Sequence, residues 1–264
     1  MTRTESPTAS QPRLPAPPDA DTSSIALFLD LDGTLLDFAA RPAGVCVEPK
    51  LRAALVRLHE RLDGALAILS GRRLREIDAL LDLGQLPAAG LHGAERRDGA
   101  GRTNLAAAGD TSVLEPVRQR AQALTAAIPG VFVEDKGQAL AIHYRQAPDA
   151  ALTIARIAQE MLSLAGKGYV LQPGNRVIEI KPAGSDKGSA LATLMAVAPF
   201  SGRMPWMFGD DLTDEAAFAC ANALGGVSVI VGSRRPTAAR CALADPGAAR
   251  AWLQCLATAP GAAA

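Results

Sequence analysis

Residues 25–35 combine a run of apolar side chains with two closely spaced carboxylates, in the order Ile25-Ala26-Leu27-Phe28-Leu29-Asp30-Leu31-Asp32-Gly33-Thr34-Leu35. Five successive apolar residues followed by polar ones are typical of a strand that is buried on both faces of a parallel sheet. Asp30 and Asp32 then lie where the chain leaves the strand. Open α/β sheets bind ligands at this carboxyl edge, so the two acids are candidates for a functional site.

A pair of carboxylates at the end of a buried strand favours a bound cation. Without one, desolvation of each carboxylate costs several kcal/mol. Mg²⁺ is the candidate, because it prefers oxygen ligands and binds through one or two carboxylates together with waters and phosphate oxygens. The same residues also fit an ordinary strand end followed by a tight turn, since Asp-Gly is a common turn pair.

The composition bounds the class of protein. The chain has 264 residues, 48% of them hydrophobic, which suits one large or two small folded domains. Lys+Arg and Asp+Glu are both 27, and no basic cluster is dense enough for nucleic acid or an anionic membrane, so neither is an expected partner. The four cysteines form no Cys-x-x-Cys pair. We therefore expect a cytoplasmic protein without structural zinc.

The order of apolar segments predicts an α/β core with an inserted second unit. Residues 1–24 are rich in Pro, Ser, Thr and Asp and are expected to form a disordered tail; no apolar run reaches the length of a membrane span. Strands at 25–29, 65–69 and 88–93 alternate with helices at 49–62 and 74–81, which favours parallel strands. From residue 96 the pattern changes to short strands and two helices, with hairpins at 96–101 and 169–180. We predict an α/β fold with a parallel-sheet core over 25–95 and 182–264 and an inserted α/β unit over 96–181.

The α/β pattern resumes after Lys181-Pro182. Ser185 is the expected N-cap of a helix, a strand at 206–208 precedes Gly209-Asp210-Asp211, and the strand at 227–231 precedes a last helix. Polar groups thus follow apolar segments at four places, namely Asp30 with Asp32, Ser70, Lys187, and Asp210 with Asp211 and Asp214.

Taken together, these four groups predict a phosphoryl-transfer site. A carboxylate about 4 Å from a phosphate dianion is repelled by roughly 8 kcal/mol at an effective dielectric constant of about 20. A Mg²⁺ ion held by Asp30 and Asp210, with the charge of Lys187 and a hydrogen bond from Ser70, would offset this repulsion. Singly, each group has an ordinary explanation: Ser70 as a helix cap, Lys187 as a surface lysine, and the acids after residue 209 as a helix start.

The expected reaction runs through a covalent intermediate. Asp30 would attack phosphorus in line and form an aspartyl-phosphate. Asp32, two residues further along, would donate a proton to the leaving alkoxide and afterwards activate the hydrolytic water.

The four groups resemble the motifs of the haloacid dehalogenase-like superfamily. Further stretches resemble one member family, trehalose-6-phosphate phosphatase: Leu69-Ser70-Gly71-Arg72, Gly90-Leu91-His92-Gly93-Ala94-Glu95, His143-Tyr144-Arg145, Val177-Ile178-Glu179-Ile180-Lys181-Pro182 and Gly209-Asp210-Asp211-Leu212-Thr213-Asp214-Glu215. The resemblance covers about residues 25–255. It implies a Rossmann-like core, with the inserted unit at 96–181 as a mobile α/β cap. It also implies a Mg²⁺-dependent phosphoric monoester hydrolase that releases trehalose and phosphate from trehalose 6-phosphate, the last step of trehalose biosynthesis.

The resemblance also implies roles for individual residues. Asp30, Asp32, Ser70 and Lys187 are the expected catalytic residues, and Asp30, Asp32 (through its main-chain carbonyl) and Asp210 the expected metal ligands. Asp211 and Asp214 are expected to support the metal site or Lys187. The substrate-binding residues implied are Arg72, Arg97, Glu134, Lys136, His143, Asn175, Glu179 and Lys181. Paired Glu and Lys suit a neutral polyol, because a carboxylate accepts from adjacent hydroxyls and an ammonium donates to others.

Three alternatives remain at this point. The cap sets specificity, so another sugar phosphatase of the same superfamily is a close rival. Glu134 and Lys136 also fit an exposed hairpin turn, and His143 a buried structural histidine. A signalling receiver also combines acids, Mg²⁺ and a phosphorylated Asp, but receivers are about half this length and lack an inserted cap. We expect a monomer with a small-molecule substrate.

Overall fold

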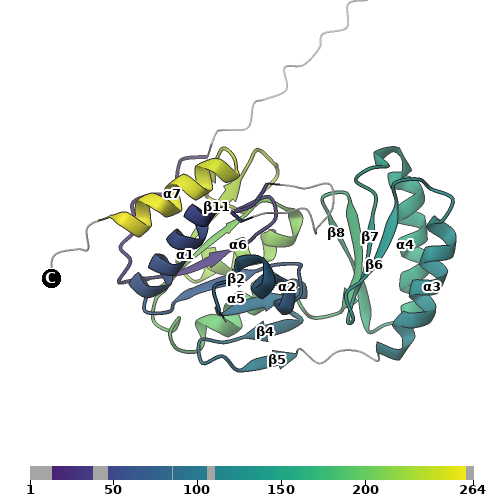
Figure 1. Ribbon diagram of the computed structural model, residues 1–264, viewed down its shortest axis with the longest axis horizontal. Helices are drawn as coiled ribbons and strands as arrows, with labels where there is room; N and C mark the ends of the chain where they lie inside the picture. Colours follow the sequence, from purple (N-terminus) through teal and green to yellow (C-terminus); the bar gives the residue numbers. More distant parts are fainter. Residues whose placement is uncertain (1–13, 38–46, 85, 106–110, 260–264) are drawn as a thin grey trace, which may run out of the picture.

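The computed structural model describes residues 14–37, 47–84, 86–105 and 111–259. These residues form two sheets with their helices, a larger core and a smaller cap (Figure 1). The core elements are β1 (Ile25–Leu29), α1 (Pro49–Arg61), β2 (Leu66–Leu69), α2 (Leu74–Leu81), β3 (Ala88–Gly90), η2 (Leu91–Gly93), β4 (Glu95–Arg97), β5 (Thr103–Leu105), α5 (Lys187–Met195), β10 (Met204–Gly209), η5 (Leu212–Asp214), α6 (Glu215–Ala223), β11 (Val227–Val231), β12 (Cys241–Leu243) and α7 (Pro246–Thr258). The cap elements are η3 (Thr111–Val113), α3 (Leu114–Thr125), β6 (Phe132–Asp135), β7 (Leu140–His143), η4 (Pro148–Ala150), α4 (Ala151–Ala165), β8 (Tyr169–Gly174) and β9 (Val177–Pro182).

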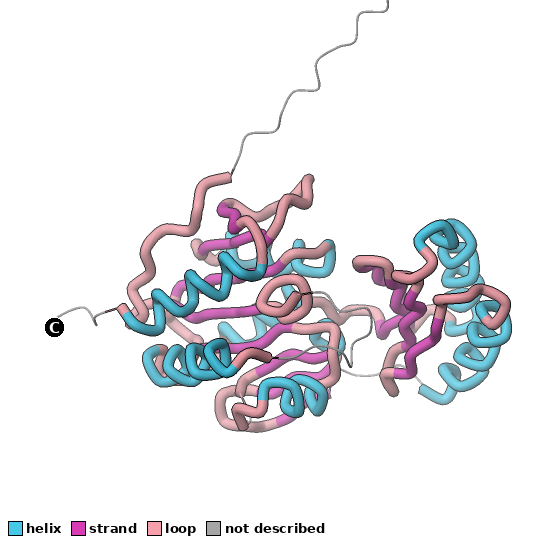
Figure 2. The backbone as a smooth tube through the Cα atoms, turned by 45° about the horizontal axis from the view of Figure 1, so that its top comes forward, coloured by secondary structure: helices cyan, strands magenta, loops and turns pink. Residues whose placement is uncertain are grey.

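The core sheet has the order β12-β11-β10-β1-β2-β3-β4-β5. The strands from β12 to β3 pair in parallel, and β1 lies between β10 and β2. Every residue of β1 and β2 is buried, because helices cover both faces of this sheet (Figure 2). The predicted α/β fold with a Rossmann-like parallel core is confirmed.

The cap sheet is antiparallel, in the order β6-β7-β9-β8, and its two helices cover one face only (Figure 1). Leu140, Ile142, Ile178 and Ile180 pack against α3 and α4. Side chains alternate between the faces of a strand, so the residues between these point away from the helices. The cap therefore turns a face that no helix covers toward the core.

The boundary of the cap differs from the predicted one. Residues 96–101 were expected to leave the core sheet, but β4 and β5 extend that sheet as an antiparallel hairpin. The cap helices and strands begin only beyond this hairpin, at η3. A hairpin turn signal marks where a chain reverses and does not say which sheet receives the second strand.

The start of the chain also differs from the prediction. Leu14 and Ala20 pack against the core, and the Ala242 N–H on edge strand β12 donates to the carbonyl of Pro15 at 2.8 Å. Residues 14–24 are therefore not a disordered tail, because they cover a sheet edge. The rest of the predicted tail, residues 1–13, lies outside the described part of the chain.

Two local points complete the fold. The N-cap of α5 is Asp186 and not Ser185, because the Asp186 carboxylate accepts from the Ser189 N–H at 2.7 Å while the Ser185 hydroxyl donates to the Pro182 carbonyl. None of the helices in the described ranges combines the length and apolar character that a bilayer span requires.

Candidate active site

The strand register brings the first two acids together. β1 and β10 pair in parallel with Leu29 opposite Phe208, and the Asp30 N–H donates to the Phe208 carbonyl at 3.0 Å. Asp30 and Asp210 therefore leave neighbouring strands at the same carboxyl edge. The Thr34 hydroxyl donates to Asp210 Oδ1 at 3.1 Å and fixes the orientation of this carboxylate.

Lys187 joins these acids from the start of α5. Its Nζ donates to Asp30 Oδ1 and to Asp214 Oδ1, each at 2.6 Å, and the residue is 2% exposed. The neighbouring Gly188 allows this approach, because a Cβ there would lie 2.5 Å from the Ala216 carbonyl oxygen of α6. A residue that looks like a surface lysine in the sequence is thus buried between two carboxylates.

The electrostatics of this group favour an additional cation. Oxygen atoms of Asp30, Asp210 and Asp214 lie within 4.8 Å of one another. Burial raises the pKa of Asp30 to about 7 and that of Asp210 to about 9, and the neighbouring carboxylates add to the shift. Burial alone would lower the pKa of Lys187, but Asp214 and Asp30 raise it above its ordinary value, so the lysine is charged. One ammonium, in contact with two of the carboxylates, is thus the counter-charge for a group of three.

The three acids differ in how many of their carboxylate oxygens already accept hydrogen bonds from the protein. Asp214 uses Oδ1 for Lys187 and Oδ2 for the N–H groups of Asp210 and Asp211, at 2.9 and 3.0 Å. It therefore supports Lys187 and the loop after β10. Asp30 and Asp210 are the carboxylates that fit a Mg²⁺ ion best, since hard oxygen ligands with raised pKa values regain their charge beside a divalent cation.

Asp32 does not join the acidic group through its side chain. Arg72 donates to it at two points, from Nε to Oδ2 at 2.7 Å and from Nη2 to Oδ1 at 2.6 Å. This is the bidentate geometry that favours a carboxylate. Ser70, at the end of β2, is 1% exposed, and its hydroxyl oxygen accepts from the Arg72 N–H at 3.2 Å. Within the described part of the chain this hydroxyl donates no hydrogen bond, so its proton is available to a ligand.

The uncovered face of the cap sheet forms the opposite wall of the same cavity, whose empty volume, open mouth included, is about 1070 Å³. Among the residues lining it are Asp30, Asp32, Ser70, Arg72, Lys187 and Asp210 from the core, and Glu134, Lys136, His143, Asn175 and Glu179 from the cap. The structure therefore brings the expected catalytic residues and five of the expected sugar ligands to one cavity.

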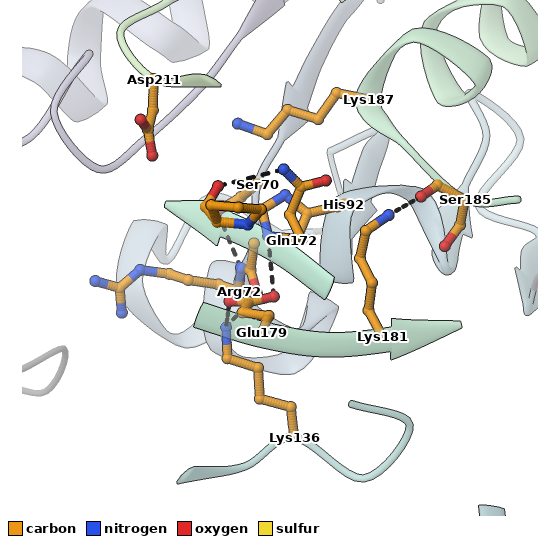
Figure 3. Close-up of polar contacts among 12 residues, drawn as sticks. Ser70, Arg72, His92, Lys136, Gln172, Glu179, Lys181, Ser185, Lys187 and Asp211 are labelled. Carbon is orange, nitrogen blue, oxygen red and sulfur yellow. Dashed lines mark hydrogen bonds and ion pairs between the residues drawn. The ribbon is translucent and has the colours of Figure 1, made fainter. Parts of the chain in front are cut away.

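The cap carboxylates are held by specific partners (Figure 3). Lys136 Nζ donates to Glu179 Oε1 at 2.5 Å and to the Gly71 carbonyl of the core at 2.9 Å. Burial alone would raise the pKa of Glu179, but Lys136 and the adjacent His92 hold it well below its ordinary value. Glu134 accepts from His143 Nε2 at 2.7 Å. These side chains present donors and acceptors in fixed positions.

Two expected site residues lie outside the cavity lining, and a third lines the cavity but is apart from the acidic group. Arg97 is 3% exposed and donates to the Leu86 carbonyl and to both carboxylate oxygens of Asp78, outside the residues that line the cavity. Lys181 is also buried beyond the cavity lining and donates to the Ser185 carbonyl (Figure 3). Asp211 lines the cavity, but its Oδ2 accepts from the Asn175 N–H of the cap at 2.9 Å, so its carboxylate contacts the cap and is not in the acidic group. The side chains of Arg97 and Lys181 thus make structural hydrogen bonds that the sequence does not reveal.

Other cavity residues were not predicted. His92 follows β3, is 7% exposed, and places Nε2 3.1 Å from Glu179 Oε2. Burial lowers the pKa of His92, and the adjacent Glu179 acts in the opposite direction. His92 lies within the Gly90–Glu95 motif of the family resemblance, which is the sequence feature that could have identified it as a cavity residue. Phe132 and Gln172 also line the cavity. Single residues on short strands carry no local signal for this placement.

The fold and the acidic group together define a class. A haloacid dehalogenase-like hydrolase from Bacteroides thetaiotaomicron superposes with a TM-score of 0.62 at 17% identity, covering 88% of this chain and 99% of that one, which shows a shared fold. The chain therefore has the fold of a haloacid dehalogenase-like hydrolase, a Rossmann-like core with a cap, and it has carboxylates at the ends of β1 and β10.

Closer comparisons identify the family within this class. The trehalose-phosphatase family model matches residues 28–246. The chain is 46% identical over 216 residues to a probable trehalose-phosphate phosphatase of Sinorhizobium fredii, covering 82% of this chain and 81% of the relative. It is 43% identical over 242 residues to the trehalose-6-phosphate phosphatase of Escherichia coli, covering 90% and 88%. The C-terminal domain of a C. albicans trehalose-6-phosphate phosphatase superposes with a TM-score of 0.81 at 25% identity, covering 94% and 99%. The chain belongs to the trehalose-phosphatase family.

Proposed function

We propose that this protein hydrolyses trehalose 6-phosphate to trehalose and phosphate through an aspartyl-phosphate on Asp30. The observation that carries the proposal is the composition of one cavity. Its core wall has the buried acids and Lys187, and its cap wall has Glu134, Lys136 and Glu179. The first wall suits a phosphate group and the second a neutral sugar. Membership of the trehalose-phosphatase family supports the choice of sugar.

Charge neutralisation is the first requirement of the reaction. Asp30 and Asp210 would hold Mg²⁺, which when bound supplies positive charge against the phosphate oxygens. Lys187 keeps Asp30 in place through its 2.6 Å contact and adds its own charge. The Ser70 hydroxyl donates to a phosphate oxygen. These groups lower the repulsion between the Asp30 carboxylate and a dianionic phosphate.

The bond changes then involve two acids. A carboxylate oxygen of Asp30 forms a bond to phosphorus while the bond from phosphorus to the sugar oxygen breaks, and that oxygen takes a proton from Asp32. Asp32, now ionised, accepts a proton from water as the water attacks the aspartyl-phosphate and releases inorganic phosphate. The two-point contact with Arg72 must loosen before Asp32 carries a proton. The phosphate dianion provides a competing partner for the Arg72 guanidinium.

The cap residues would then select the leaving group. Glu134 and Glu179 accept hydrogen bonds from hydroxyls, and Lys136 donates to others. The cavity lies between core and cap, so a substrate needs both a phosphate for the core and hydroxyls for the cap. A cytoplasmic monomer is the expected setting of this proposal.

A panel of phosphorylated substrates, namely sugar phosphates and one acyl phosphate, tests the function against the main rival, a phosphatase for another sugar phosphate. The purified protein with Mg²⁺ is incubated with trehalose 6-phosphate, glucose 6-phosphate, sucrose 6-phosphate and acetyl phosphate, and released phosphate is measured. We expect kcat/KM for trehalose 6-phosphate to exceed the others by at least about 100-fold. Equal or higher values for another sugar phosphate would overturn the substrate assignment.

A further inference from the structure

An exposed aromatic ring lies in the cap wall of the cavity. The chain has only 4% aromatic residues. Among the described residues, Phe132 is the one exposed aromatic residue. It is 37% exposed, and it lines the cavity. An exposed apolar surface surrounded by polar groups at the mouth of a cavity marks a place that a ligand covers.

The ring is held in position by its neighbours. Phe132 on β6 pairs directly with His143 on β7, and the two rings stack with centroids 4.5 Å apart and planes at 12°. The Glu134 carboxylate in turn accepts from His143 Nε2 at 2.7 Å, which fixes the orientation of the imidazole. The phenyl ring is therefore backed on one side by a ring that cannot turn freely.

The strand geometry points this platform into the cavity. Phe132 and Glu134 are two residues apart on β6, so their side chains share the face that α3 and α4 leave uncovered. The neighbouring Val133 points the other way and packs against the cap core. Arg145 and Gln172, which carry hydrogen-bonding groups, line the same cavity. An apolar plane is thus bordered by polar side chains.

We propose that Phe132, supported by His143, is a specificity-determining residue against which the C–H face of a pyranose ring of the substrate packs. This inference rests on the proposed function and names the group that recognises the ring itself. A pyranose has apolar C–H faces and a rim of hydroxyls. It matches an aromatic plane bordered by donors and acceptors, whereas an acyclic phosphate such as acetyl phosphate has no such face.

The test compares a substrate with sugar rings to one without. Phe132→Ala and Phe132→Tyr are assayed with trehalose 6-phosphate and with acetyl phosphate, and trehalose is tested as a product inhibitor. Val170→Ala is the matched control, because Val170 is also 37% exposed on the cap sheet but does not line the cavity. Circular dichroism melts of all variants establish that they are folded.

We expect Phe132→Ala to raise KM for trehalose 6-phosphate about tenfold with a smaller change in kcat. The ratio of kcat/KM for trehalose 6-phosphate to that for acetyl phosphate falls accordingly, and the inhibition constant of trehalose rises. Phe132→Tyr keeps the ring, so the KM for trehalose 6-phosphate and the inhibition constant of trehalose should return to near the wild-type values. Val170→Ala should leave these two constants at the wild-type values.

Other outcomes overturn the inference. An unchanged KM in Phe132→Ala shows that no ring packs there, and an equal loss on acetyl phosphate shows a structural role in the cap. A failure of Phe132→Tyr to restore the KM contradicts the stacking argument. If the wild-type protein itself does not prefer trehalose 6-phosphate in the substrate panel, the proposed function fails, and this result is separate from any effect of Phe132.

Discussion

Asp30 is the residue on which the proposed chemistry depends, and its surroundings separate its chemical role from its structural one. Its Oδ1 accepts from Lys187, and the residue is 5% exposed. An asparagine has nearly the same shape and keeps an oxygen acceptor for Lys187, but an amide is a poor nucleophile. The carboxylate can therefore be replaced without removing the hydrogen bond.

We expect Asp30→Asn to lower kcat on trehalose 6-phosphate by at least about 1,000-fold while the melting temperature stays the same or rises. The melting temperature does not fall, because the substitution removes one negative charge from three closely spaced carboxylates and so reduces the repulsion between them. Phosphate release and thermal melts measure the two effects. Asp149→Asn, an exposed change in the cap, serves as the control. A folded Asp30→Asn protein with substantial turnover would falsify the assignment of the nucleophile.

The raised pKa values of the acidic group predict how pH and Mg²⁺ act on stability. Burial raises the pKa of Asp30 from 3.8 to about 7 and that of Asp210 from 3.8 to about 9. Between these values and 3.8 the metal-free folded state holds more protons than the unfolded state, so this group's contribution to stability falls as pH rises through about 4 to 9. Mg²⁺ competes with these protons and restores stability where the carboxylates are ionised.

The increase in melting temperature on adding Mg²⁺ should therefore be larger at about pH 8.5 than at about pH 6. Differential scanning fluorimetry with and without Mg²⁺ at the two pH values measures it. In Asp210→Asn the dependence on pH should be much weaker. Equal Mg²⁺ effects at both pH values in the wild-type protein would contradict this account.

At the scale of elements, the loop after β10 depends on a second loop. Arg234 follows β11, and its Nε and Nη2 donate to the carbonyls of Asp210 and Asp211 at 3.1 and 3.2 Å. It also pairs with Glu215 at the start of α6, and its Nη1 donates to the Pro236 carbonyl. One guanidinium thus fixes the backbone of both acids. The fork geometry of arginine allows this, while the single ammonium of lysine does not.

We expect Arg234→Ala to weaken Mg²⁺ binding about tenfold, because groups that orient metal ligands typically contribute this much to affinity. Isothermal titration with Mg²⁺ measures the affinity directly, and saturating Mg²⁺ should recover most of kcat. Arg240→Ala, an exposed change in the same segment, is the control. A lower melting temperature with unchanged Mg²⁺ affinity would show that Arg234 stabilises the fold alone.

At the scale of the whole molecule, a few polar contacts join the cap to the core. Lys136 reaches the Gly71 carbonyl, Glu179 lies beside His92, and the Asp211 carboxylate accepts from the Asn175 N–H. The first two contacts use groups that the proposal assigns to the sugar. Substrate binding and cap position are therefore coupled through the same side chains.

We expect Lys136→Met to reduce kcat/KM for trehalose 6-phosphate by about 100-fold, since truncating one partner of a buried charge pair costs about 2–5 kcal/mol. The loss on acetyl phosphate should be much smaller, because that substrate has no hydroxyls for the cap. Lys167→Met, an exposed change in the same domain, controls for charge and fold. Equal losses on both substrates would favour a purely structural role for Lys136.

The sequence predicted the parallel core, the presence of a cap and the acids at the carboxyl ends of β1 and β10. These predictions succeeded because they depend on local information. Apolar runs such as Ile25–Leu29 specify buried strands, and the parallel register then places the residues after each strand at one edge. The same pattern of polar groups included Lys187, although its burial has no local signal in the sequence.

Only the tertiary structure decided which polar side chains meet. Arg72 pairs with Asp32 across 40 residues, Asp211 reaches the cap at Asn175 across 36, and Arg97 pairs with Asp78 outside the cavity. The hairpin of β4 and β5 joined the core sheet, and Phe132 came to line the cavity. Such pairings depend on how the cap packs on the core and on which long side chain reaches a given partner, and neither is encoded in the spacing of residues along one segment.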